Sequence, residues 1–398
     1  MLFGKTLDRQ LGARPSEVFY CKKCVVSNQR PRLTFDENGV CSACHYAHEK
    51  HHVIDWQERE ARLVDLLAQH RSKDGQYDCI VPSSGGKDSG YVAHQLKYKY
   101  GMHPLTVTWA PHIYTDIGWY NYLAFKDSGF DNFLAFANGK LQRKLARVAF
   151  ELWGDHFKIF GLGQKAIAFH FAVKFGIPLI FYGESGEIEY GGTVKNKDQA
   201  YEGVEDWSHI YFQGSHIDEL VAHGLDIGYL KPEEVKKGEA SLYWHPPVDQ
   251  LEKLNAQMHW FSFYKKWIPQ ENYYYAVDNC GFIANPEGRS EGTYSKYASL
   301  DDKTDGFHYW LGYIKFGLGR ATSDAAHEIR DGHLTREEGV ALVHRYDGEF
   351  PSKHYAEFLK YLDITDDEFW QVTNFYRELS PHLWEKVNGE WQLKHRVQ

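Results

Sequence analysis

The first half of the chain alternates between helix-like and strand-like hydrophobic patterns. The sequence DWQEREARLVDLLAQH at 55–70 places Trp56, Leu63, Leu66 and Leu67 at helical spacing, which predicts an amphipathic helix. Beyond it, short apolar runs alternate with longer helix-like segments. This alternation predicts an α/β fold with a doubly wound parallel sheet that helices cover on both faces. We expect strands at 79–83, 104–109, 132–136 and 177–182, and helices at about 88–100, 117–127, from 140 and at about 163–175.

The second half of the chain has a different pattern. Residues 193–255 are polar and mixed, which predicts an insertion or a lid. The aromatic stretches HWFSFYKKW and NYYYAVDNCG could be late strands. Beyond residue 299 the pattern is helical to near the end, and two capping boxes support this prediction. They pair Thr335 with Glu338 and Thr365 with Glu368.

The amino-acid composition argues against some classes of binding partner. The net charge of −9 argues against a partner such as tRNA, whose phosphates the protein would have to neutralise. No apolar run reaches the roughly 18–20 residues of a membrane span, and the N-terminal segment lacks the apolar core of a signal peptide. We therefore expect a cytoplasmic protein without membrane insertion. In that compartment the six cysteines favour metal ligands or buried thiols over disulfides.

Four of the cysteines have the spacing of a zinc site. Cys21 and Cys24 are separated by two residues, as are Cys41 and Cys44, and sixteen residues lie between the pairs. Two such pairs complete a tetrahedral sulfur site, and Asn38-Gly39 predicts a hairpin turn between them. A closed site of this kind is structural. The nearby histidines His45, His48, His51 and His52 are expected to be solvated.

A glycine-rich turn follows the first predicted strand. The sequence IVPSSGGKDS lacks the first glycine of a Walker A loop, and Asp88 stands where that motif has Ser or Thr. Gly85 and Gly86 would let backbone N–H groups approach an anion at a helix N-terminus. Ser84 and Ser89 would add hydroxyl donors, Lys87 a counter-charge and Asp88 a magnesium ligand. The turn resembles the pyrophosphate loop (PP-loop) of the ATP pyrophosphatases, and the alternative is an ordinary strand-to-helix turn.

A second polar segment, YGESGEIEYGG at 182–192, follows the last predicted strand and carries Glu184, Glu187 and Glu189. Three carboxylates in one turn repel each other unless a cation or donor-rich substrate neutralises them, and the alternative is a solvated acidic loop. The segment is similar to Gly-Glu-Gly-Ser-Asp-Glu-x-x-Gly-Gly of asparagine synthetases. Gly183, Glu184, Gly191 and Gly192 match, Glu187 stands where that family has Asp, and Ile188 replaces the next acid.

A third similarity to the asparagine synthetases lies further along the chain. Arg320, Glu328 and Arg330 keep the spacing of the stretch Arg-x7-Glu-x-Arg. Arg320 is therefore a candidate phosphate contact, with an arginine on a helix surface as the alternative.

Together with the stretch from Lys296 to Arg330, these motifs make the chain resemble the N-acetyl sugar amidotransferases of bacterial surface-polysaccharide and flagellar-glycan pathways. The resemblance implies conversion of an acetamido to an acetamidino group through an O-adenylated imidate, with ATP, Mg²⁺ and Zn²⁺ as cofactors. It also implies an acidic sugar substrate, either a nucleotide-linked diacetamido uronic acid or a nine-carbon acid of the pseudaminic or legionaminic type. Residues 293–317 would border the sugar pocket. Candidate contacts there are Lys296, Asp301, Asp302, Lys303 and His308, each of which could instead cap or solvate a helix.

The resemblance also predicts a division of the chain and a source of nitrogen. We expect a zinc-binding module at 1–52, a PP-loop domain at 53–192, an insertion with late strands at 193–298 and a helical region at 299–398. Neither Cys79 nor Cys280 has the sequence setting of a glutaminase nucleophile, so a separate glutaminase should supply ammonia. A PP-loop tRNA thiolase and a non-catalytic zinc-ribbon, nucleotide-binding protein remain as alternatives.

Overall fold

The structure is a computed structural model that describes residues 4–202, 216–235 and 238–398. Its main sheet has the strand order β3-β2-β1-β4-β6-β5, and all neighbouring strands are parallel except β5, which is antiparallel to β6. The strands are β1 Cys79–Pro82, β2 Pro104–Trp109, β3 Asn132–Ala135, β4 Leu179–Tyr182, β5 Tyr201–Glu202 and β6 Gln257–Trp260. This sheet confirms the predicted doubly wound α/β fold.

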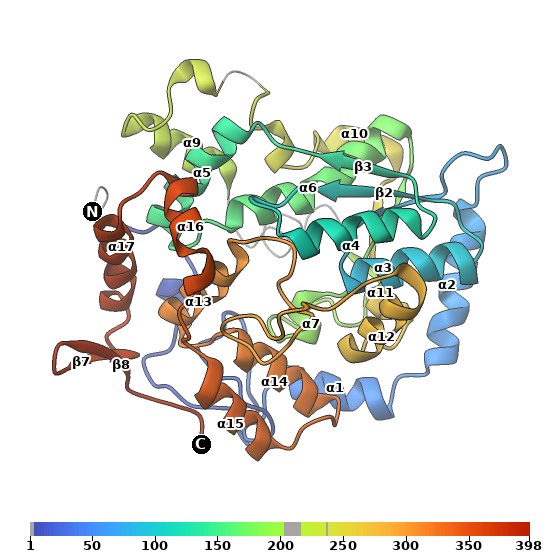
Figure 1. Cartoon of the computed structure of the whole chain (residues 1–398). Coiled ribbons are helices and arrows are strands. Elements are labelled where there is room, and N and C mark those ends of the chain that lie inside the picture. Colours follow the sequence, from blue (N-terminus) through green and yellow to red (C-terminus); the bar gives the residue numbers. More distant parts are fainter. Residues whose placement is uncertain (1–3, 203–215, 236–237) are drawn as a thin grey trace.

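Helices cover both faces of the sheet (Figure 1). In the first half of the chain they are α1 Ser42–His52, α2 Trp56–His70, α3 Lys87–His94, α4 Asp116–Asp127, α5 Gly139–Trp153, α6 Lys158–Phe175 and α7 Gly186–Glu189. Further along are α9 Ile217–Asp226, α10 Val248–Leu254, α11 Phe261–Tyr264, α12 Pro269–Cys280, α13 Asp305–Phe316, α14 Arg320–Arg330, α15 Arg336–Tyr346, α16 Tyr355–Leu362 and α17 Asp366–Glu378.

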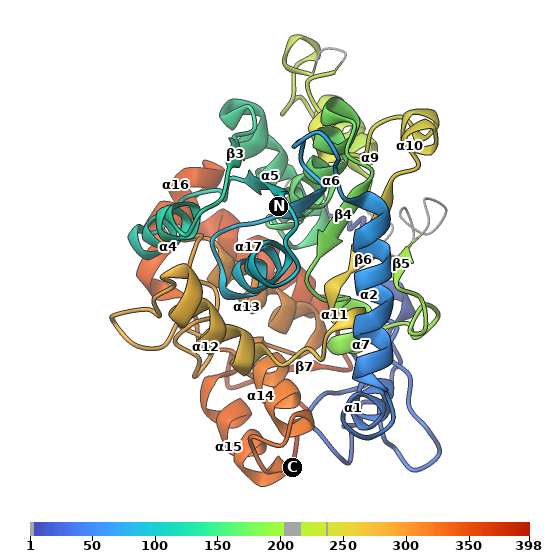
Figure 2. The ribbon, with the colours of Figure 1, turned by 90° about the vertical axis from the view of Figure 1, so that its right-hand side faces the viewer.

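Alternating side chains of each strand enter two separate cores. Ile80 of β1 packs with α5 and α6, whereas Cys79 and Val81 pack with α2, α3 and α4 on the other face. Both faces of β1 and β4 are buried, and these two strands are continuous apolar runs, as expected for the centre of a parallel sheet. Figure 2 shows α2 running along the sheet towards α1. A third core joins α13, α16 and α17 to α5, and a fourth joins the cysteine-rich N-terminal segment to α14 and α15.

Most predicted elements are present, with shifted ends. The strand at 104–109 has the predicted bounds. The helix predicted at 88–100 is divided into α3 and a π-helical turn, Gln95–Lys99, and α6 begins at Lys158, before the predicted 163. Both predicted capping boxes form. The predicted lid at 193–255 includes 203–215 and 236–237, which lie outside the described residues, and the division into domains stays a prediction.

The predictions about the second half hold only in part. NYYYAVDNCG belongs to α12, where Pro269 occupies the first turn and Gly281 caps the C-terminus. Within HWFSFYKKW, only the first two residues are in β6 and the next four form α11. Beyond residue 299 the chain forms helices as far as Glu378, as predicted, but its last part is a β-hairpin. β7 Trp384–Val387 and β8 Glu390–Leu393 form a hairpin closed by Asn388 and Gly389, both with positive φ.

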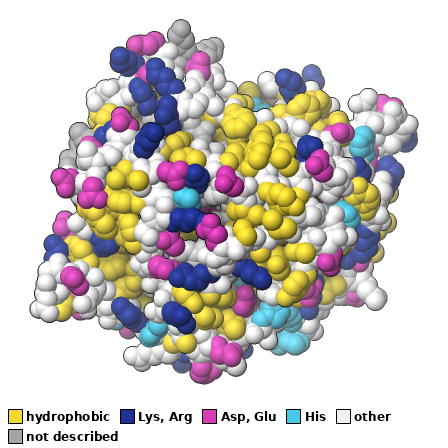
Figure 3. Space-filling model, in the orientation of Figure 1, with side chains coloured by type: hydrophobic (Ala, Val, Ile, Leu, Met, Phe, Trp, Pro, Cys, Tyr) yellow, Lys and Arg dark blue, Asp and Glu magenta, His cyan; other side chains and the backbone are white. Residues whose placement is uncertain are grey.

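The surface in Figure 3 carries charged side chains of both signs near the centre of the face and a broad apolar area beside them. Trp119, Tyr120 and Leu123 of α4 are among the exposed large apolar side chains. Among the described residues, none of the helices combines the length and the apolar character that crossing a membrane requires.

Candidate functional site

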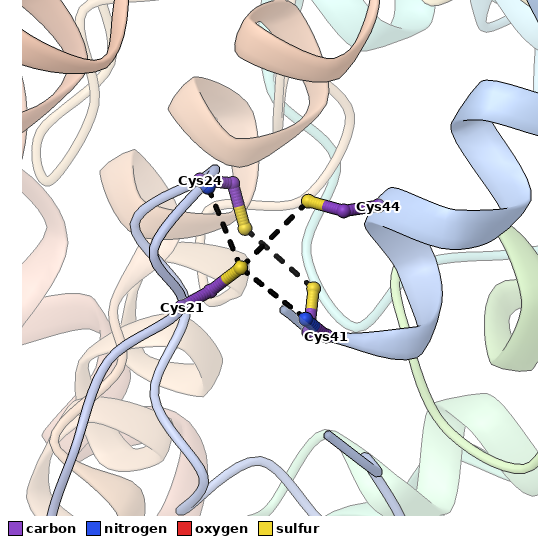
Figure 4. A group of neighbouring side chains, drawn as sticks. All are labelled: Cys21, Cys24, Cys41 and Cys44. Atoms are coloured by element: carbon purple, nitrogen blue, oxygen red, sulfur yellow. Dashed lines mark hydrogen bonds between the residues drawn. The ribbon is translucent and has the colours of Figure 1, made fainter. Parts of the chain in front are cut away.

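The four predicted zinc ligands come together in one buried cluster (Figure 4). Cys41 caps the N-terminus of α1 and Cys44 lies in its first turn, while Cys21 and Cys24 belong to the preceding segment. The Sγ atoms of Cys21 and Cys44 are 3.8 Å apart, and those of Cys24 and Cys41 are 3.7 Å apart. Tetrahedral zinc with Zn–S bonds of about 2.3 Å requires S–S distances of about 3.8 Å. The cluster could therefore hold zinc.

The cysteine cluster packs against the C-terminal helices. Cys21 and Cys24 share a core with Ala325 and Ala326 of α14 and with Val343 of α15. The N-terminal segment is therefore attached to the part of the chain that contributes Arg320.

The four histidines of α1 differ in their exposure to solvent. The His45 ring lies 3.0 Å from Asp36 and is half exposed, and the His48 and His52 side chains are exposed. His51 differs from the prediction because its ring is only 18% exposed and its Nε2 lies 2.9 Å from the buried carboxylate of Asp331. The expectation that all four are solvated is therefore wrong for His51.

The glycine turn connects β1 directly to α3, as predicted. Its hydrogen bonds are internal, because the Ser84 N–H donates to the Ser89 hydroxyl at 3.3 Å and the Gly86 N–H donates to the Ser84 hydroxyl at 3.2 Å. Lys87 forms an ion pair with Asp88, and the Asn272 amide of α12 donates to the other oxygen of Asp88 at 3.1 Å. Asp88 is thereby fixed at the first turn of α3.

Gly85 is required by both backbone conformation and packing. Its φ of +85° lies in the left-handed region, and a Cβ atom there would lie 2.5 Å from the Tyr122 Cα of α4. Gly85 and Lys87 are not among the residues that line the cavity described below. The Gly85 contact indicates that this glycine holds the turn against α4.

The three glutamates after β4 point to three different partners. Glu187 forms an ion pair with Arg32, and it also accepts a hydrogen bond from the Thr193 N–H at 2.8 Å. Glu189 is buried and lies 3.2 Å from Lys50. Glu184 accepts a hydrogen bond from the Tyr190 hydroxyl at 3.3 Å. The alternative of a solvated acidic loop is therefore wrong, because each carboxylate has a specific partner.

Burial perturbs the acidity of two of these carboxylates, Glu184 and Glu189. Burial, followed by the negative charge of Asp88, raises the pKa of Glu184 to about 8, while Lys87 opposes the shift. Burial also raises the pKa of Glu189, against the opposing charge of Lys50. A buried carboxylate close to a second one favours a proton or a cation at that place.

A cavity of about 710 Å³ joins these segments. It lies at the carboxyl ends of β1 and β4, where the strand order reverses and where open α/β sheets bind ligands. Among the predicted site residues, the cavity is lined by Ser84, Gly86, Asp88, Ser89, Glu184, Glu187 and Arg320.

Arg320 begins α14 and faces this cavity, so it is not a helix-surface arginine. Its Nε donates to Asp324 at 3.0 Å, and its Nη1 donates to the Tyr309 hydroxyl. Burial lowers the pKa of Arg320, but the combined charges of its neighbours, first Asp324 and then Tyr309 and Asp305, raise it overall. Arg330, the other arginine of the motif, lies in a different pocket, beside Cys44.

The candidate sugar-pocket residues separate into two groups. His308 lines the cavity, and its Nδ1 lies 2.9 Å from Asp155. Lys296, Asp301, Asp302 and Lys303 are not among the lining residues. Asp302 instead accepts hydrogen bonds from the N–H groups of His112 and Thr304, and Lys303 pairs with Glu357. Further residues that line the cavity were not predicted from the sequence: Arg30, Arg32, Asp155, Lys158, Tyr190 and Tyr309.

The remaining two cysteines are buried and lie away from the cavity lining. Burial raises the pKa of Cys280 to about 11, and it also raises the pKa of Cys79. Thiols of this kind are poor nucleophiles at neutral pH.

Comparison with known proteins gives one family match. Residues 291–398 match the family described as "LPS biosynthesis protein WbpG-like, C-terminal domain". The comparison with curated proteins gives no match. Among solved structures, the chain is similar to the NH3-dependent NAD synthetase from Campylobacter jejuni subsp. jejuni NCTC 11168 in complex with the nitrate ion. The two chains are 12% identical and their TM-score is 0.28. The similar region covers 50% of this chain and 95% of the synthetase chain, and the likeness is too distant to indicate a function. Residues 291–398 are thus similar to a WbpG-like C-terminal domain, and this match supports the resemblance of the chain to the N-acetyl sugar amidotransferases.

Proposed function

We propose that the protein is an AMP-forming amidotransferase that converts an acetamido group of a bacterial glycan sugar to an acetamidino group. The observation that carries the proposal is the shared cavity, in which the glycine turn, the carboxylate segment after β4 and Arg320 of the WbpG-like domain meet. The match of this domain to lipopolysaccharide biosynthesis proteins supports a sugar as the substrate.

The glycine turn is proposed to bind the phosphates of ATP. Ser84 and Ser89 offer hydroxyl groups, and the turn lies at the N-terminus of α3, where backbone N–H groups and the helix dipole favour an anion. Asp88 and Glu184 fit Mg²⁺, because both line the cavity and the charge of Asp88 contributes to the raised pKa of Glu184. Bound Mg²⁺ would neutralise phosphate charge.

The proposed reaction has two steps. First, the acetamide oxygen attacks the α phosphorus of ATP, and the bond to the β phosphate breaks as pyrophosphate leaves. Second, ammonia adds to the imidate carbon, protons are lost, and AMP departs with the former acetamide oxygen. In both steps the chain positions the reactants and stabilises negative charge, with Arg320 and the N–H groups of the 84–89 loop directed at phosphate oxygens.

The nitrogen is proposed to come from a separate glutaminase. Hydrolysis of glutamine requires a nucleophilic cysteine, and burial raises the pKa of both Cys79 and Cys280. The same burial argues against a tRNA thiolase, which needs an accessible sulfur-carrying cysteine.

Mass spectrometry tests the proposal. Candidate diacetamido sugars are incubated with ATP, Mg²⁺ and ammonium, and the expected product carries NH in place of one oxygen. Asp88→Asn should form this product about 100-fold more slowly, whereas Asp127→Asn, which removes an exposed charge on α4, should form it at the wild-type rate. If pyrophosphate is not released with any acetamido sugar, the protein is not this enzyme and the non-catalytic alternative is favoured.

A further inference from the structure

Two arginines of the cysteine-rich N-terminal segment reach the cavity. Arg30 and Arg32 lie between the two cysteine pairs in the sequence, and both line the cavity together with Ser84 and Asp88. The Arg30 Nε donates to the carbonyl oxygen of Gly191 at 2.6 Å. The Arg32 Nε donates to the Glu187 carboxylate at 3.0 Å, and its Nη2 makes a second contact with the same group. This segment is therefore part of the cavity wall.

Arg30 has no counter-charge within ion-pair distance among the described residues, in contrast to Arg32. Its one hydrogen bond there uses Nε, so both terminal nitrogens of the guanidinium remain available to a ligand. Burial, followed by the positive charge of Arg330, lowers the pKa of Arg30 to about 10. The side chain still carries its charge at neutral pH, and an unpaired cation in such a place is costly unless an anion binds to it.

The backbone beside Arg30 is strained. Arg32 has a φ of +64°, in the left-handed region that residues with a Cβ atom seldom adopt. Such conformations cost free energy and persist where the surrounding structure fixes them, often at binding sites. Here the Arg32 conformation accompanies the two-point contact with Glu187, which fixes the turn that carries Arg30.

We propose that Arg30, with Arg32 beside it, binds an acidic group of the sugar substrate. This inference rests on the proposed function. The planar guanidinium would recognise the substrate by two oxygens of a carboxylate or phosphate group. ATP is a less suitable occupant, because Arg30 is held by a hydrogen bond to Gly191 in the segment after β4, not by the 84–89 loop that is proposed to bind the phosphates. The cysteine-rich segment is thus a specificity element as well as a metal-binding one.

Equilibrium binding tests this role without turnover. The wild-type protein, Arg30→Gln and Arg30→Lys are titrated with three probes in a calorimeter. N-acetylneuraminic acid carries a carboxylate and no phosphate, UDP-N-acetylglucosamine carries phosphates and no carboxylate, and ATP reports the nucleotide site. The matched control is Lys22→Gln, which removes an exposed charge from the same segment outside the cavity. Zinc content, measured for every variant, shows whether the cluster is intact.

We expect Arg30→Gln to weaken one of the two sugar probes by about 10- to 100-fold, the range for loss of a charge-assisted hydrogen bond. Arg30→Lys should recover part of the affinity, and ATP affinity should stay within about twofold. The weakened probe identifies the acidic group as carboxylate or phosphate. The proposal is overturned if the wild type binds neither sugar probe, if Arg30→Gln binds both unchanged, or if ATP affinity falls equally. Failure of amidine formation with these results intact would refute the proposed function alone.

Discussion

Lys50→Met should destabilise the protein far more than Lys197→Met, although both lysines belong to short ion pairs. The Lys50 Nζ lies 2.9 Å from Asp331 and 3.2 Å from Glu189, and it donates to the Trp267 carbonyl oxygen at 2.9 Å. The Lys50, Asp331 and Glu189 side chains are each only 2% exposed. Lys197 lies 2.8 Å from Glu49, and both side chains of that pair are 34% exposed.

The expected magnitudes follow from this difference in exposure. Methionine has a similar length but no charge, so Lys50→Met leaves two buried carboxylates without their cation. Breaking a buried pair by removing one partner costs about 3–5 kcal/mol. Loss of an exposed pair such as Lys197–Glu49 costs about 0.2–1 kcal/mol. The predicted difference between the variants is therefore at least about 2 kcal/mol.

Urea denaturation followed by tryptophan fluorescence measures the free energy of unfolding of both variants. A double variant, Lys50→Met with Asp331→Asn, adds a second test, because removing one stranded carboxylate should make the two effects less than additive. If Lys50→Met and Lys197→Met cost the same within about 0.5 kcal/mol, the reasoning from burial is refuted.

Four other outcomes are expected. Cys41→Ser should lose zinc and several kcal/mol of the free energy of unfolding. A variant with full zinc content and an unchanged melting temperature would contradict the assignment of the zinc site. ATP should yield AMP and pyrophosphate, with turnover of Asp88→Asn reduced about 100-fold; stoichiometric ADP in a nucleotide assay would exclude the PP-loop mechanism. Because burial and Asp88 raise the pKa of Glu184 to about 8, Mg²⁺ affinity should increase as pH rises through that value, and titrations of Glu184→Gln should lack this step. The pure chain should use ammonium and not glutamine, so glutamate release without a partner would disprove a separate glutaminase.

Local patterns in the sequence were sufficient wherever neighbouring residues decide the structure. The apolar run at 104–109 predicts β2 with its observed bounds, because both faces of a central parallel strand are buried. The cysteine spacing predicts the buried cluster, since each pair needs only two intervening residues to reach one ion. Local signals of the same kind are also present where the predictions are wrong: Pro269 and Gly281 mark the two ends of α12, and Asn388-Gly389 is the turn of the last hairpin.

Only the tertiary structure decided which side chains complete the cavity. Arg30 meets Gly191 from 161 positions away, and no periodicity or motif links the two. The glutamates after β4 look equivalent in the sequence, yet Glu184 and Glu187 line the cavity, with Glu187 paired to Arg32, whereas Glu189 is buried against Lys50. The physical reason is that propensity and capping act over a few residues, whereas burial and charge pairing act between whatever segments the folded chain brings together.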